Sequence, residues 1–173
     1  MNVRHAETME IGPLATIWRD GWWEAHARLL PAELARFRTL ESFGERLWAA
    51  FADVRVAGPV QAPVGFYILK SNQLYQLYVS SLARGSGVAA ALIGDAEDRL
   101  AESGFGTAWL ACAIGNERAA SFYEKCGWRR VGTVVEHLEI PTGTFPLEVW
   151  RYEKILKSNR GSPCTSTTAP KAF

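Results

Sequence analysis

The stretch of sequence that decides the fold reads Tyr78-Val79-Ser80-Ser81-Leu82-Ala83-Arg84-Gly85-Ser86-Gly87-Val88-Ala89. An apolar, strand-like run leads into it, and a helical pattern over 88–103 follows it. A turn that joins a strand to a helix points several backbone N–H groups one way, and the helix dipole adds positive potential there. Gly85 and Gly87 place no Cβ atom in the way of an anion, and Arg84 adds a cation at the mouth. Taken alone, the turn indicates either a tight strand–helix connection or a phosphate site.

A second informative stretch lies further along the chain and reads Asn116-Glu117-Arg118-Ala119-Ala120-Ser121-Phe122-Tyr123-Glu124-Lys125-Cys126-Gly127-Trp128. Its pattern predicts a short helix over 117–126 that ends at Gly127, after a buried strand over 107–113. The stretch offers an amide, Asn116, and a phenol, Tyr123, at a strand end beside the first turn. Both aromatic residues of this helix also fit a hydrophobic core, and for Phe122 we accept that interpretation.

The region before the sheet is helical by pattern. Apolar residues at helical spacing predict a helix with one buried stripe, made of Leu14, Ile17, Trp18, Gly21, Trp22, Ala25 and Leu29. Trp23, His26 and Leu30 fall outside this stripe, so they cover a second surface or face a ligand. Pro31 breaks the helix or starts a new one. Ser42-Phe43-Gly44-Glu45 matches a capping box and predicts the start of a further helix.

Strands are predicted over 3–7, 54–57, 64–70 and 74–80, with turns at Gly58-Pro59 and Ser71-Asn72. A final hairpin over 128–140 and 145–154 turns at Pro141-Thr142-Gly143. From residue 158 the chain is rich in Ser, Thr, Pro and Gly and shows no apolar periodicity. We therefore expect a single domain over residues 1–157 and a flexible tail over 158–173.

Composition excludes several classes of function. The 173 residues are 48% hydrophobic and 21% charged, which is typical of a globular protein with a full core. A net charge of +1 gives no basis for binding nucleic acid or an anionic membrane, and no apolar run is long enough to span a bilayer. The start of the chain lacks the apolar core of a secretion signal, so we expect a cytoplasmic protein. The three cysteines show no paired-ligand spacing, so we expect no metal and interpret Cys112 and Cys126 as reduced, buried side chains.

A dinucleotide fingerprint is the sharpest competitor for the glycine turn. Gly85-Ser86-Gly87-Val88-Ala89-Ala90 fits G-x-G-x-x-A, which would indicate a nicotinamide oxidoreductase. That fold needs an acidic residue at the end of the next strand to hold a ribose, and here this strand ends Ala111-Cys112-Ala113-Ile114. We reject this interpretation, and also a nucleoside-triphosphate loop, because no Gly-Lys-Ser/Thr follows the turn.

Arg84-Gly85-Ser86-Gly87-Val88-Ala89 resembles the Q/R-x-x-G-x-G/A motif of the GNAT superfamily of acyl-CoA-dependent N-acyltransferases. The pattern Asn116-x-x-Ala119-x-x-Phe122-Tyr123-x-x-x-Gly127-Trp128 is similar to that family's second motif. The resemblance covers roughly residues 54–154, and Ser81 stands where many members carry proline. It implies an α/β (α+β) fold with a mixed, mostly antiparallel central sheet of six to seven strands and about four flanking helices. A splayed strand pair in that sheet would form the cofactor cleft.

The resemblance also implies roles for individual residues. Backbone groups of Leu77, Tyr78 and Val79 would hold the pantetheine arm and thioester of acetyl-CoA, and an N–H near Val79 would stabilise an oxyanion. The pyrophosphate would bind the N–H groups of the turn, which comprises Arg84, Gly85, Ser86, Gly87, Val88 and Ala89. Asn116 would contact the arm from the far side of the cleft, and Tyr123 would protonate the departing thiolate.

No residue is assigned as the general base that takes a proton from the acceptor amine. The stretch Gln73-Leu74-Tyr75-Gln76, where some members of the family carry a glutamate, offers only amides and a phenol. The conceivable bases are His137, Glu139, Glu24 and His26, and each of them also fits a surface or structural role. Of the adjacent tryptophans, Trp22 fits the core, and Trp23 is the better candidate for an acceptor contact or a subunit interface.

The leading hypothesis is an acetyl-CoA-dependent N-acetyltransferase that acts on the primary amine of a small molecule or a peptide. The alternative is a non-catalytic acyl-CoA-binding regulatory module, which the missing carboxylate on the 73–76 stretch favours and the intact Tyr123 opposes. Dimerisation is common in the family, and a homodimer interface could bury part of the hydrophobic residues that make up 48% of this chain.

Overall fold

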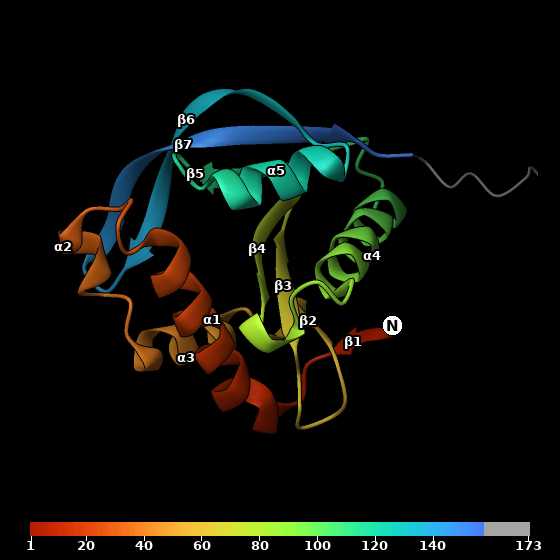
Figure 1. Ribbon diagram of the computed structural model, residues 1–173, viewed down its shortest axis with the longest axis horizontal. Coiled ribbons are helices and arrows are strands. Elements are labelled where there is room, and N and C mark those ends of the chain that lie inside the picture. Colours follow the sequence, from red (N-terminus) through yellow and green to blue (C-terminus); the bar gives the residue numbers. More distant parts are fainter. Residues whose placement is uncertain (158–173) are drawn as a thin grey trace, which may run out of the picture.

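Residues 1–157, which the computed structural model describes, fold around a seven-stranded sheet with helices on both faces (Figure 1). The strands are β1 Val3–His5, β2 Val54–Ala57, β3 Gly65–Lys70, β4 Gln73–Val79, β5 Thr107–Ala113, β6 Arg129–Ile140 and β7 Gly143–Ile155. They lie in the order β1-β2-β3-β4-β5-β7-β6, and every neighbouring pair is antiparallel except β4–β5. The predicted mixed, mostly antiparallel sheet is confirmed. The predicted tail over 158–173, with Cys164, lies outside the described residues.

The helices of the described residues are α1 Ile11–His26, α2 Ala32–Ala35, α3 Leu40–Ala49, α4 Val88–Glu102 and α5 Glu117–Lys125. Short 3-10 turns, η1 Thr8–Glu10, η2 Phe51–Asp53 and η3 Ser81–Ala83, precede α1, β2 and the glycine turn. The sequence left open whether Pro31 ends one helix or starts another. In the structure α1 has ended at His26, and Pro31 is the N-cap of the four-residue helix α2.

The predicted capping box at Ser42 is wrong, because α3 begins earlier. Its N-cap is Thr39, whose hydroxyl oxygen accepts a hydrogen bond from the backbone N–H of Ser42 at 3.1 Å. Ser42 lies in the first helical turn, and its own hydroxyl donates back to the Thr39 carbonyl at 3.0 Å. Thr39 and Ser42 are both suitable N-cap residues by type. The helix uses Thr39, which lies one full turn before the first of the buried residues Phe43 and Leu47.

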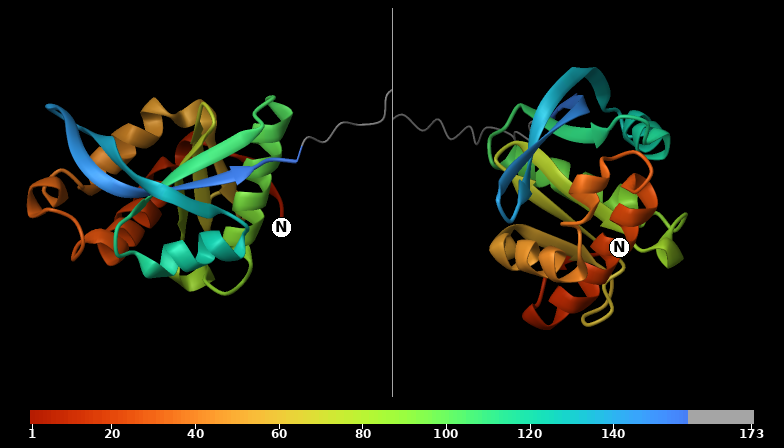
Figure 2. Two further views of the ribbon diagram at one scale, coloured as in Figure 1. Left: turned by 90° about the horizontal axis from the view of Figure 1, so that it is seen from above. Right: turned by 90° about the vertical axis from the view of Figure 1, so that its left-hand side faces the viewer.

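Figure 2 shows the sheet and its helices from two further sides. Two clusters of buried side chains fill the space between the sheet and these helices. Strand β3 contributes to both, because successive side chains of a strand point to opposite faces. Phe66 and Ile68 pack beneath α1 and α3, whereas Tyr67 packs beneath α4. Both faces of β3 are therefore buried, which explains its almost uninterrupted apolar sequence.

Strands β4 and β5 are paired only where they begin. The recorded pairing between them is Gln73 with Trp109, supported by a hydrogen bond from the Trp109 N–H to the Asn72 carbonyl at 3.1 Å. In the β3–β4 ladder Ile68 lies opposite Gln76 and Leu69 opposite Leu74, so Tyr75 is an extra, bulged residue. Bulges bend a strand and increase its twist. Beyond this bulge β4 diverges from β5, and the predicted splayed strand pair is confirmed.

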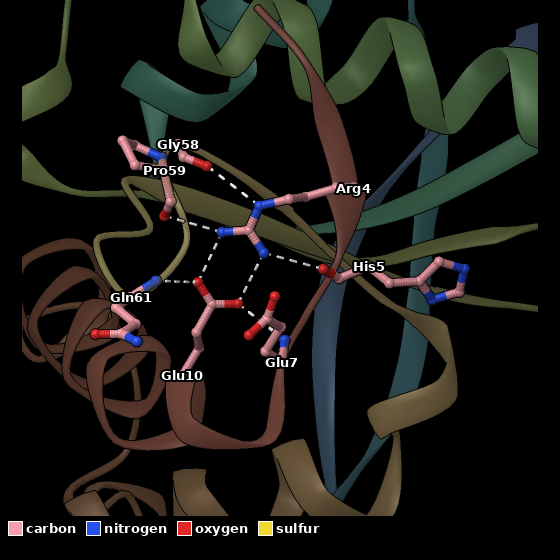
Figure 3. A network of polar contacts seen from close by, with 7 residues as sticks. All are labelled: Arg4, His5, Glu7, Glu10, Gly58, Pro59 and Gln61. Atoms are coloured by element: carbon pink, nitrogen blue, oxygen red, sulfur yellow. Dashed lines mark hydrogen bonds and ion pairs between the residues drawn. The ribbon is translucent and has the colours of Figure 1, made fainter.

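A buried ion pair fixes the start of α1 (Figure 3). The Glu10 side chain is fully buried and accepts two hydrogen bonds from the Arg4 guanidinium, at 2.9 and 2.7 Å. It also accepts from the backbone N–H groups of Glu7 at 2.8 Å and of Gln61 at 3.1 Å. The Arg4 hydrogen bonds are the main cause that lowers the pKa of the Glu10 carboxyl below its usual value. The network ties β1, the entry to α1 and the β2–β3 connection together.

Helix α1 then crosses β4 at a glycine. A Cβ atom at Gly21 would lie 2.6 Å from Cδ1 of Tyr78, which is closer than any real contact of this kind. The absence of a side chain at Gly21 lets the helix backbone approach the strand, while the Tyr78 ring packs on Trp18 and Phe66 with centroid distances of 6.2 and 6.0 Å. This close crossing places the C-terminal half of α1 over the opening between β4 and β5.

Candidate active site

The opening between β4 and β5 is a cleft with a volume of about 560 Å³. Its walls come from α1, α3 and the connection before it, β4, the glycine turn, the start of α4, β5, α5 and the β6–β7 hairpin. Of the predicted site residues, ten line this cleft: Leu77, Tyr78, Val79, Arg84, Gly85, Gly87, Val88, Ala89, Asn116 and Tyr123. Ser86 is the exception, because its hydroxyl is turned back to donate to the Ala83 carbonyl.

The glycine turn has the geometry of an anion site. Gly85 and Gly87 have φ angles of +75° and +84°, and Gly87 is the N-cap of α4. Within residues 1–157, the backbone N–H groups from Gly85 to Ala90 donate to no protein acceptor. A Cβ atom built at either glycine would meet no other atom within 4 Å, so the turn borders open space. Free N–H groups at the start of a fifteen-residue helix fit a phosphate group.

Arg84, the cation predicted at the mouth of the cleft, is paired with a carboxylate. Its guanidinium binds the Glu24 carboxylate through two hydrogen bonds of 2.7 and 2.5 Å, and Arg118 binds the same carboxylate at 2.9 Å. Glu24 lies on α1 and Arg118 on α5, so this cluster bridges the mouth of the cleft. Hydrogen bonds, first from Arg84 and then from Arg118, lower the pKa of Glu24 to about 2. Because both arginines occupy its carboxylate and it does not line the cleft within the described residues, Glu24 is a poor candidate for the general base.

Asn116 has a structural task that limits its predicted role. Its side-chain oxygen accepts a hydrogen bond from the Ala119 N–H at 3.2 Å and so caps α5. The residue lines the cleft as predicted. Because the oxygen is engaged in the cap, the side-chain NH₂ group is the part that remains for a ligand.

Tyr123 lies on α5, half-buried in the wall of the cleft. Its ring packs beside Phe122 and Tyr152, with centroid distances of 5.6 and 6.0 Å. Burial in this apolar wall raises the pKa of the Tyr123 phenol above its usual value. Burial also raises the pKa of the Cys112 thiol, which lines the same cleft, to about 12. Both groups are therefore fully protonated near neutral pH.

The far end of the cleft contains residues that the sequence did not single out. Arg38, Arg46 and Glu136 line it, together with His26 and the apolar residues Trp18, Trp22, Leu30, Leu138 and Leu147. Glu136 could have been found from the alternation of β6, because it shares one face of the strand with Leu138. For the two arginines no local pattern distinguishes a wall of the cleft from an ordinary surface.

The suggested bases are spread over different environments. His26 lines the cleft, and burial lowers the pKa of its imidazole to about 4. Glu139 binds Lys70 at 2.8 Å, and neither it nor His137 borders the main cleft within the described chain. Burial raises the pKa of the Glu136 carboxyl, for which no ion pair is recorded in residues 1–157.

Trp23 does not reach the cleft, within the described residues, but it supports the cleft wall. Its indole N–H donates to the backbone carbonyl of Arg38 at 3.0 Å, and its ring is 44% exposed. Trp22 is buried and lines the cleft. The predicted place of Trp22 in the core is confirmed, and the same residue also borders the cleft. Trp23 is not among the cleft residues of the described chain, and the alternative role predicted for it, a subunit interface, stays a prediction.

No helix within residues 1–157 is both long and apolar enough to cross a membrane. In the same residues no group of three or more His, Cys, Asp or Glu side chains could hold a metal ion.

Comparison with known proteins finds one family and many related folds. The model of a family described as Acetyltransferase (GNAT) family matches residues 14–128. No curated protein matches the chain. Among solved structures, a GCN5-related N-acetyltransferase from Rhodopseudomonas palustris is similar at 20% identity with a TM-score of 0.70, over 90% of this chain and 95% of that one.

Two other similar structures belong to proteins that are named as N-acetyltransferases. The ribosomal-protein-alanine N-acetyltransferase from Brucella melitensis has 20% identity and a TM-score of 0.65, over 90% of this chain and 100% of that one. The PaiA N-acetyltransferase from Thermoplasma acidophilum, in complex with coenzyme A, has 18% identity and a TM-score of 0.63, over 89% and 98% of the two chains. At these identities the likeness establishes the fold alone.

Proposed function

Because this chain belongs to the GNAT acetyltransferase family and is thus an acyltransferase, we propose that it transfers an acetyl group from acetyl-CoA to the primary amine of a small molecule or peptide. The observation that carries the proposal is the row of free N–H groups from Gly85 to Ala90, beside the splayed edge of β4. Acetyl-CoA, when bound, supplies the acetyl group as an activated thioester. A coenzyme A complex of a similar fold supports the choice of co-substrate.

The chain offers complementary groups along the whole cleft. The N–H groups of the turn would hold the diphosphate, and the unpaired backbone edge at Leu77–Val79 would hold the arm. The neighbouring Arg84 and Arg118 would add positive potential at the mouth, although both already share Glu24. Binding of the phosphates therefore has to take place beside an existing ion-pair cluster.

Tyr123 is the proposed proton donor. Burial raises the pKa of its phenol, so the proton is present on Oη at neutral pH. Burial in the same wall raises the pKa of the Cys112 thiol to about 12, and we expect desolvation to act in the same direction on the cofactor sulfur. A thiolate that departs into this wall would be comparably basic, and transfer of the phenol proton to it is then feasible.

Cys112 itself does not act as a nucleophile in this proposal. A thiol attacks as its thiolate, and a pKa of about 12 leaves almost none of that form near neutral pH. The acetyl group would therefore be transferred directly to the amine, without a covalent acetyl-enzyme intermediate.

Glu136 is the proposed general base. We expect Glu136→Gln to lower kcat/KM by about 10²-fold, the lower range for loss of a general base. The wild-type activity should fall on acidification as Glu136, whose pKa is raised, takes up its proton, and this acidic limb should be lost in the variant. The measurement is the pH profile of thiol release from acetyl-CoA.

The matched control for this base is Glu148→Gln, which changes an exposed carboxylate on the facing strand β7. It should leave kcat/KM within a factor of two or three of the wild type, the range of ordinary surface substitutions. Unchanged turnover in Glu136→Gln together with a defect in His26→Gln would assign the base to His26 instead.

The phosphate turn is tested with Gly87→Val. A β-branched residue is strained at φ +84°, and its side chain would project into the open space that the phosphate needs. We expect wild-type acetyl-CoA to bind with a Kd of about 1 μM or tighter, and the variant to bind at least about tenfold more weakly. Titration calorimetry measures both. Gly94→Val in the middle of α4, where a Cβ also meets nothing within 4 Å, is the control, and equal affinity of all three proteins would refute the site.

A further inference from the structure

Two arginines line the cleft near Tyr75 and Leu138, and neither pairs with a carboxylate of the described chain. Arg38 lies in the connection between α2 and α3 and is only 3% exposed. Arg46 lies on α3. The glycine turn follows the C-terminal end of β4. The two arginines lie elsewhere along the cleft: Arg46 contacts β4 at its bulged residue Tyr75, and Arg38 contacts Glu139 near the tip of the β6–β7 hairpin.

Arg38 uses little of its hydrogen-bonding capacity. One guanidinium nitrogen, Nη1, donates to the backbone carbonyl of Glu139 at 2.9 Å, which is a neutral acceptor. Its Nε is buried and has no hydrogen-bond partner. Burial is the main cause that lowers the pKa of Arg38 to about 10, so the side chain is still charged near neutral pH. The residue is thus a buried cation with free N–H donors that borders a cavity.

Arg46 adds a second charge at the same place. Its guanidinium donates to the Tyr75 hydroxyl at 3.1 Å and lies 4.3 Å from the centroid of the Trp18 ring. Its Nε is also buried without a partner. Repulsion by Arg46 contributes to the lowered pKa of Arg38, which shows that the two charges are close enough to interact. Glu139 offsets them only weakly, because its carboxylate binds Lys70 at 2.8 Å.

A buried guanidinium without a counter-ion, such as that of Arg38, costs free energy, and the second, half-buried guanidinium of Arg46 close to it adds to that cost. A ligand with a negative charge would remove this cost, because planar guanidinium groups bind carboxylates with paired hydrogen bonds. We propose that the acceptor of this enzyme is an amine that also carries a carboxylate, and that Arg38, assisted by Arg46, binds that carboxylate. The inference rests on the proposed transfer to an amine and narrows it to one class of substrate.

The rest of this end of the cleft fits a zwitterion with an apolar side chain. Glu136 supplies the opposite charge for the ammonium group, and Trp18, Trp22, Leu30, Leu138 and Leu147 supply an apolar wall. An amino acid with an aromatic or aliphatic side chain carries all three features. Polyamines and aminoglycosides, which carry several positive charges and no carboxylate, would be repelled by the two arginines.

The test compares three acceptors that differ only at the carboxylate: L-phenylalanine, L-phenylalaninamide and phenethylamine. With saturating acetyl-CoA, we expect kcat/KM for L-phenylalanine to exceed that for the other two by at least about tenfold, the value of one good charge-assisted contact. A kcat/KM for phenethylamine or the amide equal to or above that for L-phenylalanine would overturn the inference.

Binding is measured separately by titration calorimetry of the three compounds into protein with coenzyme A. Preferential binding of L-phenylalanine without any thiol release would support the carboxylate site and contradict the proposed transferase function. Equal transfer to all three compounds would contradict the carboxylate site and support the transferase function. The two proposals can therefore fail independently.

Arg38→Met tests the residue, and Arg36→Met, an exposed arginine in the same connection, is the matched control. Arg38→Met should abolish the preference for L-phenylalanine mainly through KM, and Arg36→Met should keep it. The melting temperature of Arg38→Met should equal or exceed that of the wild type, because an unpaired buried charge is removed. If Arg38→Met lowers the melting temperature and leaves the acceptor preference unchanged, Arg38 serves the fold instead. If the variant keeps the acceptor preference and loses affinity for coenzyme A, Arg38 serves the cofactor instead.

Discussion

Tyr123→Phe is expected to reduce kcat by roughly 10²- to 10⁴-fold, the usual contribution of a positioned proton donor. The Kd for acetyl-CoA should change by no more than a factor of about three, because the phenyl ring that packs beside Phe122 and Tyr152 is retained. Steady-state thiol release gives kcat, and titration calorimetry gives Kd. A variant with wild-type kcat would move the proton-donor role to water or to another group.

The pH dependence and a neighbouring tyrosine sharpen this test. Because burial raises the pKa of Tyr123, the acid form persists above pH 10, and we expect no alkaline loss of activity from this residue below that value. Tyr152→Phe is the matched control: its hydroxyl donates to Glu124 at 3.1 Å, and the side chain does not border the cleft in the part of the chain described. Its kcat should stay close to that of the wild type.

Arg4→Met is expected to have the largest effect on stability. The substitution leaves the fully buried Glu10 carboxylate without its partner, and breaking a buried pair in this way costs about 3–5 kcal/mol. For a chain of this size each kcal/mol lowers the melting temperature by roughly 2–4 °C, so we expect a decrease of roughly 6–20 °C by differential scanning calorimetry. The exposed pair Arg19–Asp20 provides the control Arg19→Met, which should change the free energy of unfolding by less than about 1 kcal/mol.

The pH dependence of this stability has a definite sign. The pKa of Glu10 is lowered in the folded protein, so its contribution is present above the unfolded pKa of about 4.3 and is lost as the pH falls through the folded pKa. The difference in stability between wild type and Arg4→Met should therefore shrink below about pH 4, where the variant's Glu10 is protonated. The double variant Arg4→Met/Glu10→Leu should recover most of the loss at neutral pH, since both charges are gone. If Arg4→Met melts at the wild-type temperature, the network contributes nothing to stability.

Many of the helices, strands and turns of the fold can be predicted from local patterns in this one sequence. The glycine turn, the helix after it and the second motif around Tyr123 are recognisable by spacing within a few residues. The mixed sheet with its splayed strand pair was predicted only through the family resemblance that these motifs carry, and the order of the strands in the sheet was not predicted. The start of α3 was misassigned because Thr39 and Ser42 are equally good caps by type, and only packing decides between them. Local preference alone does not carry that information.

The chemistry at the two ends of the cleft was predictable to different degrees. The turn that fits a phosphate consists of backbone atoms, so glycine positions reveal it. The ion pair of Arg84 with Glu24 links residues that are 60 positions apart in the sequence. The hydrogen bond from Arg38 to the Glu139 carbonyl links residues that are 101 positions apart. Such pairings depend on how α1 crosses the sheet and where the long hairpin ends, and no spacing rule in the sequence encodes them.

Because β4 and β5 pair at one position, the backbone N–H and C=O groups along the rest of this edge lack a neighbouring strand, although they lie in the middle of the sheet. Free strand edges invite other chains to add to them, and proteins usually confine such edges to the rim or cover them. Here residues of both α1 and α5 line the cleft beside this edge. Displacement of either helix would therefore uncover a strand edge of the kind that pairs with other chains, and the Arg4–Glu10 ion pair at the start of α1 opposes such a displacement.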